Sequence, residues 1–170
     1  MLLAGKLDLA IMSTPVRDRR LVSRPVFDDE LVVVAARDHR FAKQTHVRLC
    51  RICGTKRCTC TRRSEESRVL QEVLVPAGHV PARVEEVMLT ESIAELVKAG
   101  LGVSVLARWA VQPLVDAGSI VIRPLTARGL RRQWRAVMPK DLAGADYIGE
   151  FIELLGKHAP TARASRISRA

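Results

Sequence analysis

Residues 87–109 have the sequence VMLTESIAELVKAGLGVSVLARW, and this stretch decides the fold class. A short β-favouring run ends at Thr90, whose hydroxyl is suited to cap the first turn of a helix. Ile93 and Val97 lie four residues apart on one helical face, and Gly100 is a typical helix stop. The apolar run Val103–Leu106 follows as a second strand. A strand, a helix and a strand within about twenty residues predict a βαβ crossover in the parallel sheet of an α/β protein.

The start of the predicted helix is also a candidate ligand site. Thr90, Glu91 and Ser92 would present amides and hydroxyls at the carboxyl end of a strand. Open α/β sheets bind small anions at such places, because the first-turn amides have no partner within the helix. The same residues are equally consistent with an ordinary capped helix start, so both interpretations remain open at this point.

Residues 89–111 resemble the effector-binding domain of LysR-type transcriptional regulators, in which a Thr-Glu-Ala-Ile helix precedes a Gly-Leu-Gly-Val strand. Three other segments match the family in the same order, namely GKLDLAI at residues 5–11, PVFDDELVVVAARDH at 25–39, and the late strands within 118–137. The resemblance covers about 1–47 and 64–155, and it is closest to the methionine-biosynthesis branch.

The resemblance implies an α/β, bilobal fold like that of the type-2 periplasmic binding proteins. The first lobe would be incomplete and discontinuous, with residues 1–29 plus 140–156. The second lobe would comprise residues 30–139, and residues 157–170 would form a disordered basic tail. The chain starts at what resembles the end of the first effector-domain helix, without the winged helix-turn-helix of the family. We therefore expect a truncated regulator with weakened homo-oligomerisation and no sequence-specific DNA binding by this chain alone, and this interpretation includes a chain that has lost its function.

In the resembling proteins the effector binds between the lobes, which implies a set of contact residues here. Ser13 and Thr14 follow a first-lobe strand, and the second lobe would add the remaining candidates: Thr90, Glu91, Ser92, Gly102, Val103 and Ser104. The partner would be a small-molecule effector, such as an amino acid or a related metabolite, and no cofactor is implied. Turn chemistry alone also explains Ser13 and Thr14, and Ser104 is equally consistent with a satisfied core hydroxyl.

Composition argues against a membrane or nucleic-acid protein. The 170 residues carry a net charge of +10, but residues 48–63 alone hold six of the 28 Lys and Arg and no acid. Without them 22 basic residues face 18 acidic ones, a charge of +4, which is ordinary. Aromatic residues make up only 4%, so no stacking platform for single strands is indicated. The absence of a membrane span or a secretion signal predicts a cytoplasmic protein that does not contact membranes.

All four cysteines lie in the Cys/Arg-rich window 48–63. Cys50, Cys53, Cys58 and Cys60 suggest a zinc-stabilised basic interaction module as one alternative, although the usual pair of Cys-x2-Cys knuckles is absent. A frameshift explains the window better. Codons for the family-like peptide PDLRDETLYLYT, shifted by one frame, encode CRICGTKRCTCT, which is the sequence of residues 50–61. We expect such a polar replacement to form a loop outside the sheet, because burying its cations is unfavourable.

No motif supports catalysis. The sequence contains no Gly-x-Ser-x-Gly elbow, phosphate loop or His-Glu-x-x-His, and its four histidines lie in turn-like or tail contexts. The prediction is therefore a small-molecule sensing domain of a LysR-type regulator, and not an enzyme. The solute-binding protein of a transporter is the alternative with the same fold.

Overall fold

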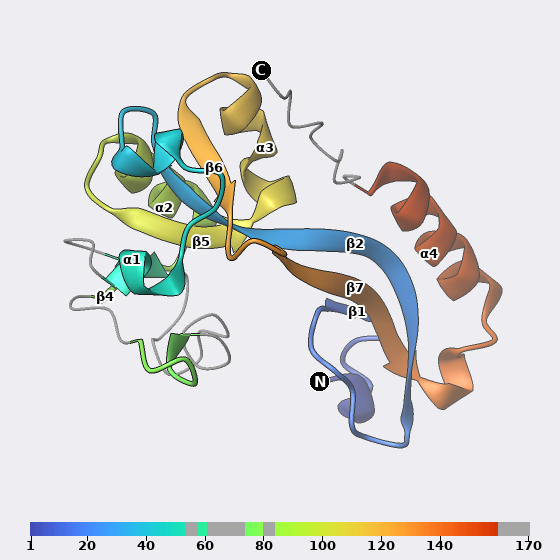
Figure 1. Cartoon of the computed structure of the whole chain (residues 1–170). Coiled ribbons are helices and arrows are strands. Elements are labelled where there is room, and N and C mark those ends of the chain that lie inside the picture. The colour runs from blue at the N-terminus through green and yellow to red at the C-terminus, as the bar shows by residue number, and fades with distance from the viewer. Residues whose placement is uncertain (54–57, 61–73, 80–83, 160–170) are drawn as a thin grey trace. The chain divides into compact units, whose positions relative to one another are not determined.

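Figure 1 shows a computed structural model of the chain, which describes residues 1–53, 58–60, 74–79 and 84–159. Contacts divide the chain into two compact units. Unit 1 is Met1–Asp29 with Arg131–Ala170, and unit 2 is Glu30–Leu130. The late strand of residues 131–139 therefore belongs to unit 1, whereas the sequence placed it in the second lobe. It belongs there because its partners, the strand β1 and the first part of β2, lie in unit 1.

Unit 1 contains a three-strand sheet covered by one long helix. After the short η1 (Leu2–Ala4) come β1 (Ala10–Met12) and the first part of β2 (Leu21–Ala36); β7 (Leu130–Pro139) lies between them in the sheet. The strands β1 and β7 are antiparallel, with Ala10 opposite Val137. The chain then forms η5 (Lys140–Leu142) and α4 (Asp146–His158), and Ile148 of α4 packs on Ala136 and Met138 of β7.

Unit 2 is built on a mixed sheet. The second part of β2 pairs antiparallel with β5 (Val103–Ala107) and with β6 (Ile120–Pro124). The short strand β3 (Cys58–Cys60) pairs parallel with β5 on one side and with β4 (Val84–Glu86) on the other. The helices described in this unit are η2 (Arg40–Lys43), α1 (Leu49–Cys53), α2 (Thr90–Lys98) and α3 (Arg108–Asp116).

Both faces of this sheet are covered, which explains the continuous apolar run of β2. Val33 and Ala35 face one cluster, which includes Phe41 and Ile52. Val32 and Val34 face the opposite cluster, which is built from α2 and α3 and is represented by Ile93, Val97 and Val111. Successive strand residues point to opposite faces, so a strand covered on both sides has to be apolar at every position.

The predicted βαβ crossover is confirmed. The strands β4 and β5 run parallel to β3, which lies between them, and α2 connects them. One detail of the prediction is wrong, because Thr90 is the first helical residue and Leu89 occupies the N-cap position. No side chain among the described residues caps this helix start. The helix ends where expected, at Lys98, and Gly100 takes a positive φ of 73°.

The strand β2 continues without interruption for 16 residues. The acidic residues at positions 28–30 do not break it, because side chains on other elements pair with them, as described below. The strand β1 is short and half-buried. In α4, Phe151 is 49% exposed, so it does not belong to the packed face of the helix.

The window 48–63 is not simply a loop. Residues 49–53 form α1, whose Ile52 is fully buried, and Cys58–Cys60 form β3 inside the sheet. The backbone hydrogen bonds of β3 to β4 and β5 do not depend on side-chain identity, so polar residues can still fill this position. Residues 54–57 and 61–63 lie outside the described residues. The disordered tail predicted at residues 157–170 is wrong at its start, because Lys157 and His158 belong to α4, and residues 160–170 lie outside the described residues. Within the described part, no helix has the length and apolarity needed to cross a membrane.

Candidate functional site

The carboxyl ends of the parallel strands of unit 2 define the candidate site. Two helices begin there, since α2 follows β4 and α3 follows β5 directly at Arg108. Glu30 lies at the same edge, because β2 runs antiparallel to β5 and Leu31 pairs with Ala107. Two helix starts at one sheet edge place several partnerless backbone amides together, and this arrangement favours anionic groups.

Thr90, Glu91 and Ser92 occupy the first turn of α2 at this edge. Thr90 is half-buried, and Glu91 and Ser92 are exposed. The backbone amide of Ile93 donates to the carbonyl of Leu89. The amides that precede Ile93 in the first turn have no acceptor within the helix. The three residues are therefore accessible, as an effector contact requires.

Arg108 is the charged group that sequence analysis did not identify here. Its Nη1 donates to Glu30 Oε2 over 3.4 Å, a long contact between side chains that are 15% and 20% exposed. Its Nε is buried and has no hydrogen-bond partner among the described residues. A buried guanidinium donor without an acceptor is unfavourable, so Arg108 has an unused capacity to bind an anion.

Gly129 leaves room for the Glu30 carboxylate, because it has no side chain. It has a φ of +72°, and a Cβ at this position would lie only 2.6 Å from Glu30 Oε1. A residue with a side chain would therefore be strained and would displace the carboxylate that pairs with Arg108. One weak signal for this group is present in the sequence, namely an arginine directly after an apolar strand and at the start of a helix.

The other predicted contacts of unit 2 lie elsewhere. Gly102 precedes β5 and Val103 is its first residue, so they are at the amino end of the strand, the opposite edge from Thr90. Val103 is 1% exposed, and Ser104 is fully buried with interactions of its own. The structure therefore does not bring these three residues together with Thr90, Glu91 and Ser92.

In unit 1, Ser13 and Thr14 form a half-buried bend directly after β1. A polar cluster lies on β2 and β7 of the same unit. Asp29, with a side chain only 1% exposed, accepts through Oδ2 from Arg132 at 2.9 Å and from Trp134 Nε1 at 3.4 Å. Its Oδ1 is buried without a partner among the described residues. The Arg132 guanidinium also lies over the Trp134 ring, 4.6 Å from its centre.

The zinc alternative concerns the cysteines of residues 50–60. Among the described residues, no group of three or more His, Cys, Asp or Glu side chains could hold a metal ion. Cys50 is an exposed free thiol, whereas the side chains of Cys53, Cys58 and Cys60 lie outside what the structure describes.

Comparison with known proteins decides the family. The model of the LysR substrate binding domain matches residues 1–160. This chain belongs to the LysR substrate-binding domain family. Among solved structures, the regulatory domain of MetR from N. meningitidis superposes with a TM-score of 0.81 and 26% identity, over 92% of this chain and 72% of that one. The fold is thus the type-2 periplasmic-binding-protein-like fold of LysR regulatory domains, as expected.

Curated relatives of this LysR domain are transcriptional regulators. The RuBisCO operon regulator of Allochromatium vinosum is 23% identical over 91% of this chain and 51% of its own length. MetR of Haemophilus influenzae is 24% identical over 90% of this chain and 49% of its own. The chain thus spans about half the length of these curated relatives. The family match favours a regulator's effector-binding domain over the solute-binding protein of a transporter.

Proposed function

We propose that this chain is the effector-sensing part of a transcriptional regulator, and that it binds a small zwitterionic metabolite of the amino-acid class at the carboxyl edge of the unit 2 sheet. The observation that carries the proposal is Arg108, whose buried Nε has no partner at the edge where α2 and α3 begin. The LysR family match supports the sensing role, and it favours a regulator over a catalyst.

The chemistry of the edge selects the ligand class. The Arg108 guanidinium and the first-turn amides of α2 suit a carboxylate. Glu91 in the same turn is exposed and would repel a purely anionic ligand, but it can pair with an ammonium group. The hydroxyls of Thr90 and Ser92 add adaptable donors and acceptors. Ser13 and Thr14 stay predicted effector contacts of unit 1, and Gly102, Val103 and Ser104 would act only indirectly, through the packing of β5.

Calorimetric titration with a panel of amino acids and their deaminated and esterified analogues tests the proposal. We expect binding that requires both the carboxylate and the ammonium group, and that is lost in Arg108→Ala. Arg108→Lys should also lose at least tenfold in affinity, because it keeps the charge but not the Nε donor. The lysine variant also serves as a control, because a loss of binding in Arg108→Ala alone could result from misfolding.

The matched control is Arg128→Ala, which removes an exposed arginine from the loop before Gly129. It should bind as the unaltered chain does. Unchanged binding in Arg108→Lys and in Thr90→Val together would refute this site, although the family membership would stand.

A further inference from the structure

The contact between Arg108 and Glu30 leaves one side of the guanidinium open. Glu30 Oε2 accepts from Nη1, at the tip of the group, over 3.4 Å. The Nε of the same guanidinium is buried and has no hydrogen-bond partner among the described residues, although the side chain as a whole is 15% exposed. Arginine binds carboxylates through two parallel N–H bonds in a fixed plane, and the Nε side offers such an edge. The pair with Glu30 therefore does not use this edge.

Two features of unit 2 fix the Glu30 carboxylate. Leu31, the next residue of β2, pairs with Ala107, which directly precedes Arg108, so the strand register sets the two charged residues near each other. Gly129 lies against Oε1, where a Cβ would come within 2.6 Å. One carboxylate oxygen thus contacts the arginine, and the other packs on a residue without a side chain.

The pair also changes what the site can select. A lone guanidinium attracts any anion by its charge, whereas a guanidinium beside a carboxylate is largely neutralised when seen from a distance. Its remaining attraction depends on directed hydrogen bonds, which a planar carboxylate accepts in pairs and a spherical ion such as chloride does not. The paired Arg108 should therefore select ligands by shape and not by charge alone.

We propose that Glu30 is the positioning residue of the effector site: it holds Arg108 through Nη1, offsets its charge, and so presents the Nε side to a planar carboxylate. Gly129 supports this role, because its lack of a side chain keeps the Glu30 carboxylate within reach of Arg108. The role rests on the anion site proposed above, but not on the identity of the amino acid that binds there. It explains why an acidic residue lies directly beside a site for carboxylates.

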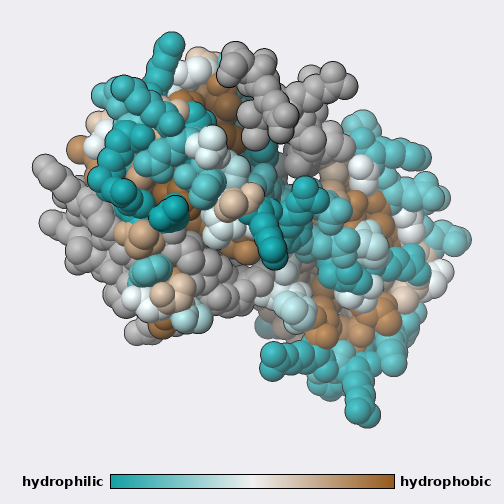
Figure 2. Space-filling view, viewed as in Figure 1, coloured by the Kyte–Doolittle hydropathy of each residue, from teal (hydrophilic) through white to brown (hydrophobic). Residues whose placement is uncertain are grey.

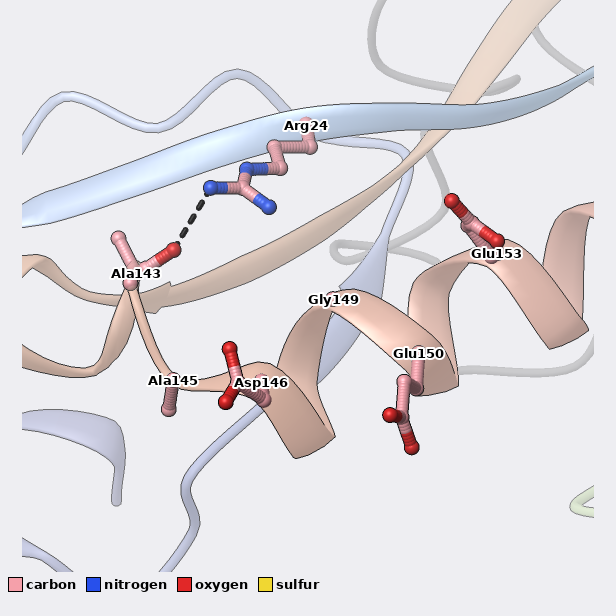
Figure 3. Close-up of a pocket in the computed structure, with 8 residues that line it drawn as sticks. Arg24, Ala143, Ala145, Asp146, Gly149, Glu150 and Glu153 are labelled. Carbon is pink, nitrogen blue, oxygen red and sulfur yellow. Dashed lines mark hydrogen bonds between the residues drawn. The ribbon is translucent and has the colours of Figure 1, made fainter.

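The arginine that lines the cavity of unit 1 lacks such an arrangement. Arg24 lines an open cavity of about 420 Å³ together with Asp146, Glu150 and Glu153 (Figure 3). Its Nη2 donates to the carbonyl oxygen of Ala143 at 2.6 Å. In Figure 2 hydrophobic and hydrophilic side chains lie next to each other over α4. Three carboxylates around one guanidinium make this cavity net negative, so it disfavours anions and provides an arginine for comparison.

Anion titrations followed by NMR at the Nε–Hε group of Arg108 test the proposal, with acetate as the planar probe and chloride as the spherical one. Arg108→Lys assigns the signal, because lysine has no Nε. The quantity compared is the ratio of the dissociation constants for chloride and acetate, in which the general effect of removing a negative charge cancels. In Glu30→Ala we expect this ratio to fall about tenfold, the effect of one well-placed hydrogen bond to a charged group. Glu30→Gln keeps an acceptor for Nη1 and should give an intermediate ratio.

Gly129→Ala provides a second variant, in which the charge of Glu30 is retained but its carboxylate is displaced. The ratio should fall in this variant too. The matched control is Glu95→Ala, which removes an exposed carboxylate that pairs with Lys98 at 3.2 Å near the end of α2. It should leave the ratio unchanged, and the Arg24 signal should show no preference for acetate in any variant.

An unchanged ratio in both Glu30→Ala and Gly129→Ala would overturn the positioning role, whereas acetate binding at Arg108 would leave the anion site itself intact. If the ratio falls as expected but no amino acid binds in the calorimetric panel, the ligand class proposed above is wrong and the role of Glu30 stands. An Arg108 signal that responds to neither anion in the unaltered chain would refute both.

Discussion

The two parts of β2 differ in burial although they form one continuous strand. In unit 2, each residue of Val32–Ala36 is at most 4% exposed, because clusters of side chains cover both faces of the sheet. In unit 1, none of the residues from Leu21 to Asp28 is buried, and α4 supplies the packing on the core cluster. Among the described residues, the core cluster of unit 1 has three buried members, whereas each cluster of unit 2 has seven. Since stability follows the apolar area removed from water, unit 2 should be the more stable of the two.

The two tryptophans allow this comparison to be measured, because Trp109 reports on unit 2 and Trp134 on unit 1. The largest expected effect is that of Phe41→Ala in the unit 2 core, where Phe41 has no exposed area. It should lower the free energy of unfolding by about 3–5 kcal/mol in the transition seen by Trp109, because it leaves a large cavity. Urea denaturation of single-tryptophan variants, made with Trp→Phe, measures it.

Ile148→Ala is the counterpart in unit 1, with an expected loss of about 2–3 kcal/mol, since the half-buried residues around Ile148 can close part of the cavity. If both substitutions shift both tryptophan transitions equally, the units unfold as one, and the contrast between them is wrong.

The next largest effect concerns the charged pair in each unit. Arg132→Ala leaves the Asp29 carboxylate buried without its cation, and we expect a loss of about 3 kcal/mol in unit 1. Arg108→Ala should be milder, about 1–2 kcal/mol, because Glu30 is 20% exposed and the contact is longer. Urea denaturation of both variants tests the order. Asp29→Asn, which removes the buried charge instead of its partner, should destabilise less than Arg132→Ala, and the reverse would contradict the argument.

Two glycines of unit 2 differ in the space available for a side chain. Gly118 and Gly129 both have positive φ, but a Cβ meets nothing at Gly118 and meets Glu30 Oε1 at Gly129. Gly118→Ala should therefore lose about 1 kcal/mol from backbone strain alone, and Gly129→Ala about 2 kcal/mol. In a Glu30→Ala background the loss at Gly129 should fall to that at Gly118. Thermal denaturation of the four variants measures this, and equal losses from the start would exclude the close contact.

The smallest expected effects are pH dependent, with one group in each unit. Burial lowers the pKa of His39, whose Nδ1 accepts from the Phe41 amide at the start of η2. Its stabilising contribution is complete above pH 6.5, the ordinary value, and is lost as the pH falls through the lowered pKa. His39→Asn keeps an acceptor without titrating there, so it should remove this dependence from the Trp109 transition. A pH dependence below 6.5 that persists in His39→Asn would rule out His39 as its source.

In unit 1, the hydrogen bond from Arg20 lowers the pKa of Asp18 to about 2. The contribution of this exposed pair is present above pH 3.8 and is lost as the pH falls towards 2. Asp18→Asn should therefore reduce only the acid part of the pH dependence of stability in unit 1. The measurement is the denaturation midpoint of the transition reported by Trp134, followed between pH 5 and pH 2. A change confined to the region near neutral pH would contradict this assignment.

Local patterns in the sequence were sufficient for the elements whose signals are short in range. The helix of residues 90–98 follows from its apolar spacing and its glycine stop, and the crossover follows from the strands on either side. The residues Thr90, Glu91 and Ser92 could be placed at a helix start for the same reason. The ordered family motifs were specific enough to predict the fold, because each one fixes an element and its position in the chain.

Tertiary structure decided what depends on partners distant in sequence. The acidic run at residues 28–30 lies inside β2, and the strand continues through it because Gln133, Arg132 and Arg108 pair with these carboxylates. Likewise, residues 58–60 form a strand because β4 and β5 provide its hydrogen bonds. The approach of Glu30 to Arg108 and Gly129 could not be predicted either, since 78 residues separate the two charges along the chain. Propensity and periodicity carry no information about such contacts, which exist only when packing brings the two segments together.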